Sequence, residues 1–393
     1  MQRAPPANDL SRIPAPSSEA ALHSAQVLAH IRRSIEAAGG WIPLADYVNE
    51  ALYAPGLGYY VAGARKFGAD GDFVTAPELT SLFGKAVAAQ VEEVLAQVPG
   101  DVVELGPGSG KMAADVLEAL VARDALPQRY LLLEVSPELR ERQRQTLVQR
   151  SPQLLGRVAW IDALPHRWSG VLLANEVLDA IPAHVVARAG GRWVERGVTV
   201  DGAVLRLADR PLRDDALLEA ARAAFPPDGD YLSEVNPAAQ ALVRSLARRC
   251  ERGAMLFVDY GFPAAEFYHP QRSQGTLMAH YRHRALADPL IFPGLADLTT
   301  HVDFSAIAGG AVAEAMDVAG FATQARFLVN CGVLDLLAAI GEPTTAPYLR
   351  EAKAVQTLLS PAEMGELVKV LALTRDIAPP LRGFRAGDRS HRL

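Results

Sequence analysis

The sequence predicts an α/β protein built around a mostly parallel, Rossmann-like sheet, and three observations lead to this prediction. A β-branched pair, Val102-Val103, precedes a glycine-rich turn over 106–110, and apolar residues over 112–120 then recur at helical spacing. A strand, a tight turn and a helix in this order form the first half of a nucleotide-binding βαβ unit. Further short apolar runs follow along the chain, as buried parallel strands require. Polar residues end these runs, which places them where α/β sheets bind ligands.

The composition excludes several classes of protein. The chain has 393 residues, of which 50% are hydrophobic and 21% are charged, as is usual for a globular protein. The net charge of −6 gives no electrostatic footprint for binding nucleic acid, so we expect no such partner. No apolar run is long enough to span a membrane. Residues 1–20 lack the apolar segment of a secretory signal, and we expect a disordered tail on a cytoplasmic protein.

The two cysteines, Cys250 and Cys331, are far apart and form no metal-ligand pattern. They indicate a reducing compartment. The pair His280-x-x-His283 has no Cys or Glu to complete a zinc site. We therefore expect no metal.

The glycine turn distinguishes between nucleotide ligands. Its pattern is Glu104-x-Gly106-x-Gly108-x-Gly110. A dinucleotide fingerprint would place its third glycine at position 111, which is Lys111, and a Walker loop would need Ser or Thr directly after that lysine. The acidic residue with glycines at alternate positions resembles motif I of class I S-adenosylmethionine (SAM) methyltransferases. A glycine turn without a ligand is the alternative.

The part of the chain before this turn is predicted to be helical. Apolar residues recur at helical spacing over 20–38, and a second short helix is expected over 42–53. A helix over 78–97 then leads into the motif strand, and Thr75 is placed to cap its start. Capping alone would explain this residue; the functional alternative is that Gly71, Asp72 and Thr75 form a lid over the cofactor.

The second and third strands supply candidates for binding adenosine. The run 129–135 includes Glu134, whose ionised carboxylate would suit the two hydroxyl donors of a ribose. The run 157–162 ends in Asp162, which could accept from the adenine amine, while Trp160 either flanks the ring or packs in the core. The helix between these strands has a charged face that we expect to lie in solvent: Glu138, Arg140, Glu141, Arg142 and Arg144.

The fourth and fifth strands supply candidates for binding the substrate. The run 170–174 leads directly into Asn175 and Glu176, and the run 253–261 places Asp259 at the same edge of the sheet. We expect Asn175 and Glu176 to grip the substrate near the methyl group. Helix capping by Asn175 is the alternative.

Two segments interrupt the alternation of strands and helices. Residues 183–236 read as antiparallel strands with a hairpin turn at Asp201-Gly202, followed by a helix, and include the acid Glu234. Residues 264–304 are polar without clear periodicity, and are either functional or disordered. The remaining elements are predicted as a helix over 304–319, a strand over 322–328, helices over 333–340, 348–358 and 361–373, and a last strand near 381–384.

Six motifs together resemble the MidA-like methyltransferases: 52–60, 71–78, 104–110, 175–179, 259–261 and 297–304. That family includes the mitochondrial complex I assembly factor, a protein-arginine methyltransferase. The resemblance implies the class I SAM-methyltransferase fold, with a seven-stranded mostly parallel sheet, a helical N-terminal extension and inserted substrate-side segments. It also implies SAM as cofactor and methyl transfer to an arginine side chain of a protein. A respiratory-complex subunit as substrate and a homodimer as assembly are left open.

The expected division of the chain follows from these assignments. It comprises a tail over 1–19, a helical and lid region over 20–98, a SAM-binding core over 99–182 and 237–385, an inserted substrate or partner region over 183–236, and a second insertion over 264–304.

A guanidinium is always charged, so ionised carboxylates are its natural ligands. Glu176, with Glu234 or Asp259 as second acid and Asn175 as an orienting amide, could hold it. A non-catalytic SAM-binding assembly chaperone is the main alternative. An NAD(P)-dependent oxidoreductase is disfavoured by the glycine spacing.

Overall fold

The computed structural model describes residues 13–62 and 75–393, which divide into two compact units. Residues 75–178, 240–263 and 302–393 form the core unit, and residues 13–62, 179–239 and 264–301 form the accessory unit. Residues 1–12 of the tail predicted over 1–19, and the lid residues Gly71 and Asp72, lie outside the described residues, whereas Ser18 and Glu19 belong to the first helix. No helix in the described part of the chain is long and apolar enough to span a membrane.

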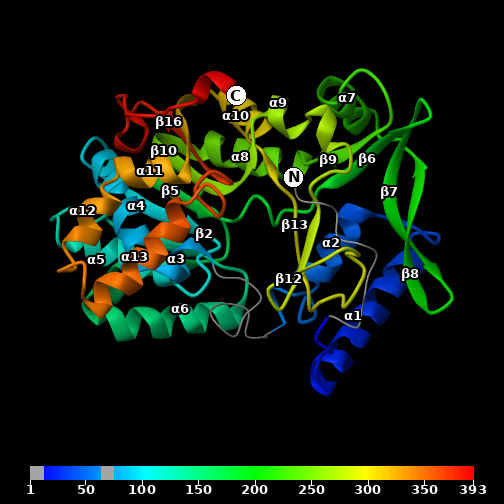
Figure 1. Cartoon of the computed structure of the whole chain (residues 1–393), viewed down its shortest axis with the longest axis horizontal. Coiled ribbons are helices and arrows are strands. Elements are labelled where there is room, and N and C mark those ends of the chain that lie inside the picture. Colours follow the sequence, from blue (N-terminus) through cyan, green and yellow to red (C-terminus); the bar gives the residue numbers. More distant parts are fainter. Residues whose placement is uncertain (1–12, 63–74) are drawn as a thin grey trace. The chain divides into compact units, whose positions relative to one another are not determined.

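The core unit is built on one sheet, whose strands lie in the order β15-β16-β10-β5-β2-β3-β4. Figure 1 labels β16, β10, β5 and β2 of this sheet. All neighbours from β10 to β4 are parallel, and only β16 runs antiparallel to both of its neighbours. This confirms the predicted class I methyltransferase fold. The strands span Asp101–Leu105 (β2), Tyr130–Leu133 (β3), Val158–Ile161 (β4), Trp168–Asn175 (β5), Cys250–Phe262 (β10), Asp317–Thr323 (β15) and Val368–Arg375 (β16), with β14 (Val302–Asp303) added beside β10.

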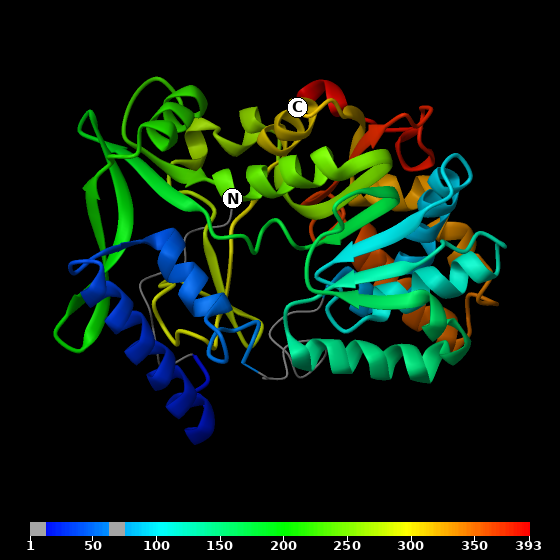
Figure 2. The ribbon, with the colours of Figure 1, turned by 180° about the vertical axis from the view of Figure 1, so that it is seen from behind.

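Helices pack on both faces of this sheet (Figure 2). On one face, α4, α5, α11, α12 and α13 bury apolar side chains against β2, β5, β10 and β16. On the other, Phe304 of α10 lies 5.3 Å from Phe321 of β15 between ring centroids. Burial on both faces explains why the strands are continuous apolar runs. The helices span Ala76–Leu79 (α3), Ser81–Leu95 (α4), Lys111–Val121 (α5), Pro137–Arg150 (α6), Pro237–Arg249 (α8), Phe304–Val312 (α10), Gln324–Asn330 (α11), Val333–Ala338 (α12) and Ala346–Leu359 (α13).

The predictions for the C-terminal elements are wrong in four places. The helix predicted over 304–319 ends at Val312, and the last three residues of the predicted range belong to β15. The predicted helix over 361–373 contains most of strand β16, the predicted strand over 322–328 is mostly helix α11, and the predicted last strand near 381–384 is a 3-10 turn, Arg382–Phe384. Strand β16 is buried along almost its whole length. A short run that is apolar on every side has no period that separates a strand from a buried helix.

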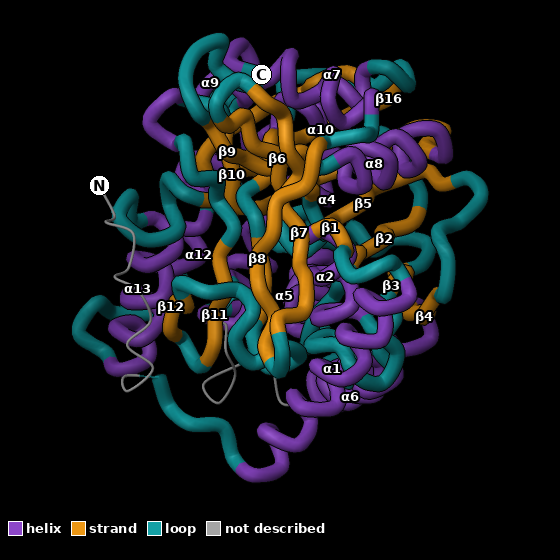
Figure 3. The backbone as a smooth tube through the Cα atoms, turned by 90° about the vertical axis from the view of Figure 1, so that its right-hand side faces the viewer, coloured by secondary structure: helices purple, strands orange, loops and turns teal. Residues whose placement is uncertain are grey.

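The accessory unit combines the N-terminal helices with both interrupting segments. A sheet in the order β1-β7-β6-β9 carries β8 on β7, and β7 and β8 form a hairpin (Figure 3). Its apolar core takes side chains from α1, α2, β6 and β7 and from the second segment. The elements span Ser18–Ala37 (α1), Ile42–Pro43 (β1), Leu44–Tyr53 (α2), His184–Ala189 (β6), Arg192–Asp201 (β7), Val204–Pro211 (β8), Asp215–Ala224 (α7), Tyr231–Val235 (β9) and Ala264–Phe267 (α9).

The segment 264–304, which shows no periodicity in the sequence, contains a small antiparallel sheet. Strand β11 (Met278–Tyr281) pairs with β12 (Arg284–Leu286) on one side and with β13 (Asp297–Thr299) on the other. Strands of three or four residues are too short to produce a recognisable alternation.

Candidate cofactor and acceptor site

The glycine turn that follows β2 requires glycine for steric reasons. Gly106, Gly108 and Gly110 have φ values of 57°, 53° and 80°, in the left-handed region that side chains disfavour. A Cβ added at Gly110 would lie 3.0 Å from the Cα of Gln143. The turn is therefore closely packed against helix α6.

Two side chains connect this turn to the short helix α3. The Oγ of Ser109 donates to the Glu78 carboxylate, and the Nζ of Lys111 donates to the carbonyl of Pro77 at 2.5 Å. Lys111 also forms an ion pair with the buried Asp115 at 3.2 Å. The Thr-Ala-Pro-Glu stretch is thus held against the glycine turn.

Thr75 occupies the N-cap position of α3, but its side chain makes no capping hydrogen bond. The helix expected over 78–97 is divided at Thr80, whose hydroxyl caps α4 by accepting from the backbone N–H of Leu82 at 3.0 Å. The proposed role of Thr75 toward a cofactor stays a prediction.

Glu104, the acid of the glycine motif, is 1% exposed. Its Oε2 accepts a hydrogen bond from the hydroxyl of Tyr130 at 2.5 Å. Burial raises the pKa of Glu104 to about 7, and the bond from Tyr130 opposes this shift.

Glu134 follows strand β3 and is 6% exposed. Its two oxygens accept from the backbone N–H of Ser136 at 2.8 Å and from Nε2 of Gln143 at 3.1 Å. Burial raises the pKa of the Glu134 carboxyl, and these hydrogen bonds act against that shift. A carboxylate offers about four acceptor positions, so these donors do not use its full capacity.

Gln143 is a residue of this site that the sequence analysis missed. It is fully buried, and besides Glu134 its Nε2 donates to the carbonyl of Gly108 at 3.0 Å. Its Oε1 accepts from the indole N–H of Trp160 at 2.9 Å. A signal was present in the sequence, because Gln143 lies four residues from Leu139 and from Leu147 and so belongs to the buried stripe of α6.

The charged face of α6 was expected to lie in solvent, but two of its arginines contact neighbouring elements. Arg140 donates to the carbonyls of Glu134 at 2.7 Å and Ile161 at 2.9 Å, and also to Asp162 at 2.7 Å. The guanidinium of Arg144 lies 4.5 Å from the ring centroid of Trp160. Arg140 therefore links the ends of β3 and β4, and Arg144 packs on the aromatic ring of β4. The side chain of Asp162 itself is 89% exposed, so its predicted role toward adenine stays a prediction.

The turn after β5 holds Glu176 in an unusual backbone conformation, with φ of 51°. Its backbone N–H donates to the carbonyl of Val258 on β10 at 2.8 Å. A left-handed conformation at a residue with a Cβ costs about 1–3 kcal/mol, and such residues are enriched at active sites.

Asp259 is 1% exposed and stabilises this turn. Its Oδ2 accepts from the backbone N–H groups of Val177 at 3.1 Å and Leu178 at 2.8 Å, and its Oδ1 accepts from that of Tyr260 at 2.9 Å. The structure therefore gives Asp259 a role in shaping the turn. A direct contact with a methyl acceptor stays a prediction.

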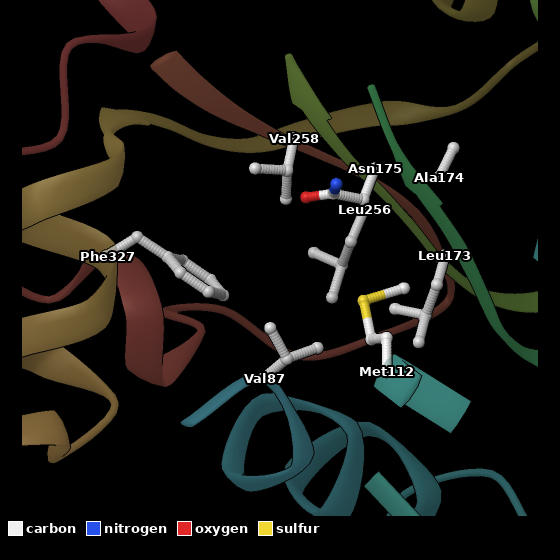
Figure 4. A pocket seen from close by; sticks show the side chains of 8 residues that line it. All are labelled: Val87, Met112, Leu173, Ala174, Asn175, Leu256, Val258 and Phe327. Atoms are coloured by element: carbon white, nitrogen blue, oxygen red, sulfur yellow. The ribbon is translucent and has the colours of Figure 1, made fainter. Parts of the chain in front are cut away.

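Asn175 carries an acceptor whose hydrogen-bonding capacity is unused. Among the described residues, its buried Oδ1 has no hydrogen-bond partner, while its Nδ2 lies 3.4 Å from the carboxylate of Glu176. Figure 4 shows Asn175 beside a cavity of about 10 Å³, in which the other labelled side chains are apolar. The cavity is lined by Val87, Met112, Leu173, Ala174, Asn175, Leu256, Val258 and Phe327.

Glu234 belongs to the accessory unit and is 2% exposed. Its carboxylate accepts from the backbone N–H groups of Thr276 at 2.7 Å and Leu277 at 2.9 Å, and from the Thr276 hydroxyl at 3.1 Å. Burial raises the pKa of Glu234, and these bonds oppose the shift. The carboxylate holds the turn before β11, and its expected role as a second acid stays a prediction.

Comparison with known proteins identifies the family to which this site belongs. Residues 82–322 match the model of a family described as "Putative S-adenosyl-L-methionine-dependent methyltransferase". The chain belongs to this family. A crystal structure from Burkholderia thailandensis bound to S-adenosyl-homocysteine is 47% identical, with a TM-score of 0.93, and the match covers 97% of this chain and 100% of that one. SAM is therefore the cofactor of this methyltransferase.

Curated relatives of this methyltransferase match over most of its length. The Drosophila melanogaster protein named "Protein arginine methyltransferase NDUFAF7 homolog, mitochondrial" is 31% identical over 92% of this chain and 87% of its own. The human protein named "Protein arginine methyltransferase NDUFAF7, mitochondrial" is 29% identical over 88% of this chain and 83% of its own. The expectation of a cytoplasmic location is wrong on this comparison, because these relatives are named as mitochondrial proteins.

The residues of the methyltransferase core unit fit SAM in three respects. Glu134 keeps acceptor capacity for ribose hydroxyls, and Asn175 has a buried acceptor without a donor. The left-handed glycines leave the backbone of the turn without side chains that would block a ligand. The assignment of each residue to one part of SAM stays a prediction.

Proposed function

We propose that this methyltransferase transfers the methyl group of SAM to an arginine guanidinium of a protein substrate, and that Glu176 holds that guanidinium. The observation that carries the proposal is the match to curated relatives that are named protein arginine methyltransferases and cover 92% and 88% of this chain. The strained turn at Glu176 supports it, because a carboxylate held at a cost in backbone energy is typical of a functional residue.

The chain's own residues would bind and orient both reactants. In the proposed arrangement the glycine turn and Glu134 hold the nucleoside end of SAM, and Asn175 accepts a hydrogen bond from the cofactor. SAM, when bound, supplies a methyl group on a positively charged sulfur. The task of the protein is to hold an arginine nitrogen in line with that methyl group and to exclude water.

Glu176 suits an arginine substrate for reasons of charge and proton balance. Guanidinium is always protonated and offers paired N–H donors, which a carboxylate accepts in a bidentate arrangement. On methylation the attacking nitrogen forms a bond to carbon, the sulfur keeps the electron pair of the broken bond, and the nitrogen loses one proton. The carboxylate of Glu176 is an acceptor for that proton.

The first prediction tests this role by changing Glu176 to Gln, which keeps the shape of the side chain and removes its charge. Loss of one partner of a buried charge pair costs about 2–5 kcal/mol, so transfer of label from radioactive SAM to protein should fall about 30-fold or more. Affinity for S-adenosyl-homocysteine should change less than about threefold, because Glu176 does not contact the cofactor in this arrangement.

Glu363→Gln is the matched control, since Glu363 is exposed on the same core unit. Full label transfer by the Glu176→Gln variant would overturn the proposal. An absence of transfer by the unmodified protein to any protein of a cell extract would instead favour the alternative function, a SAM-binding assembly chaperone without activity.

The identity of the acceptor is a separate question with its own test. Mass spectrometry of the labelled protein would show whether it is a subunit of a respiratory complex. Light scattering on the purified chain would show whether it forms a homodimer.

A further inference from the structure

We propose that Gln143 is a positioning residue of the cofactor site, whose side-chain amide holds the Glu134 carboxylate and the Trp160 ring in one arrangement before SAM binds. The proposal rests on the placement of the adenosine half of SAM beside Glu134. It assigns a specific role to helix α6, whose face toward the site joins the glycine turn to the ends of β3 and β4.

Both N–H groups and the oxygen of the Gln143 amide have a hydrogen-bond partner, and each partner has the matching role of acceptor or donor. The two N–H groups of Nε2 serve the carbonyl of Gly108 at 3.0 Å and the carboxylate of Glu134 at 3.1 Å, and Oε1 accepts from Trp160 at 2.9 Å. Rotating the amide by 180° would place oxygen against two acceptors and N–H against a donor. The orientation of this side chain is therefore fixed by its three partners.

Packing alone does not explain an amide at this position. Gln143 lies between Leu139 and Leu147 on the buried stripe of α6, so a leucine would continue an apolar stripe. A buried amide is costly unless its partners are paired. The partners of Gln143 are the glycine turn, the expected ribose acceptor and the aromatic residue expected beside adenine, so the amide connects three parts of one site.

Gln143 also affects the charge of Glu134. A carboxylate must be ionised to accept from two hydroxyls without itself donating. Burial favours the protonated form of Glu134, and the N–H of Gln143 is one of the groups that favour the ionised form. By this argument Gln143 sets the orientation of Glu134 and supports its charge.

The first test compares affinity for S-adenosyl-homocysteine, measured by calorimetry, in the wild type and in Gln143→Leu. The leucine removes three hydrogen bonds and leaves their partners unpaired, so affinity should fall about tenfold or more, and the melting temperature should fall as well. Gln145→Leu is the control, because Gln145 is exposed on the same helix and its side chain donates to the exposed Glu141. Its affinity should match that of the wild type.

The second test uses Gln143→Glu, which keeps an acceptor for Trp160 and sets a second carboxyl about 3.1 Å from that of Glu134. Two carboxyls at this distance bind one shared proton at low pH and repel each other at high pH. Affinity should therefore be weak at pH 8 and recover toward that of the wild type near pH 6. A residue with only a packing role would give the same ratio of affinities at both pH values.

Glu134→Ala separates failure of this proposal from failure of the proposed site. Wild-type affinity in Glu134→Ala would show that adenosine does not bind at Glu134, and would overturn both. Weakened binding in Glu134→Ala with wild-type binding in Gln143→Leu would overturn the role of Gln143 alone. If Gln143→Leu does not fold, the pH profile of Gln143→Glu decides, and a pH-independent affinity would reject the proposal.

Discussion

At the scale of single residues, the core unit contains buried carboxylates that differ in their hydrogen-bond donors. Asp259 accepts from three backbone N–H groups, whereas Glu104 accepts one hydrogen bond, from Tyr130. The difference is visible in the pKa of Glu104, which burial raises from 4.5 to about 7. Burial thus lets this motif acid keep its proton up to about pH 7, which the spacing of the motif does not reveal.

This shift predicts a pH dependence of stability that Glu104→Gln should remove. Between pH 4.5 and about 7 the folded state holds a proton on Glu104 that the unfolded state releases. Stability is therefore fully present below pH 4.5 and falls as the pH rises to about 7, by about 3 kcal/mol at about 1.4 kcal/mol per unit. Urea unfolding at pH 5 and pH 8 should show a smaller loss in the Gln variant than in the wild type. Equal losses would show that Glu104 ionises normally.

The positions of several candidate site residues could be predicted from the sequence. Glu134, Asn175 and Glu176 were selected because each follows a buried strand, and the structure places each at the end of its predicted strand. The spacing of Gln143 from Leu139 and Leu147 indicates that it is buried, but not what it binds. Its contacts depend on how α6 packs, which no local sequence rule specifies.

At the scale of elements, the parallel strands β2, β3, β5 and β10 could be predicted from the sequence, whereas strand β16 near the edge of the sheet could not. Strands β2, β3, β5 and β10 are apolar runs with distinct ends, and each was assigned correctly. Strand β16 is equally apolar, but it is the antiparallel strand inserted between β15 and β10. Its place follows from long-range pairing with two strands that lie more than 40 residues earlier in the chain, and a sequence window contains no information about that pairing.

The junction between the glycine turn and α6 gives a prediction at this scale. Gly110→Ala would place a side chain at φ of 80° and a Cβ 3.0 Å from the backbone of Gln143. It should reduce stability by about 1–2 kcal/mol and weaken S-adenosyl-homocysteine binding, because the turn and the helix would have to separate. Gly156→Ala is the control, since a Cβ there meets nothing within 4 Å and φ is not positive. Equal stability of the two variants, measured in urea, would contradict the packing argument.

At the scale of the whole molecule, the described candidates for binding the cofactor lie in one unit and the inserted segments 183–236 and 264–301 lie in the other, with residues 237–239 also in the accessory unit. The described candidates for binding SAM, from Thr75 to Asn175, all lie in the core unit. The accessory unit is assembled from three separate stretches of chain, and Glu234 joins two of them by accepting hydrogen bonds from the turn at 276–277. The sequence predicted the elements of these stretches in part. Their common core became visible only in three dimensions.

Because Glu234 lies in the accessory unit, Glu234→Gln should reduce methyl transfer to protein more than it reduces affinity for S-adenosyl-homocysteine. The amide would turn an N–H toward groups that are themselves donors, and a buried donor without an acceptor costs about 1–3 kcal/mol. The turn before β11 should loosen, so transfer of label to a protein acceptor should fall if the accessory unit serves the acceptor. Affinity for S-adenosyl-homocysteine should stay within about twofold of wild type, because every described cofactor candidate lies in the core unit. Calorimetry and label transfer on one preparation decide, and a parallel loss of both would show that the cofactor site depends on the accessory unit.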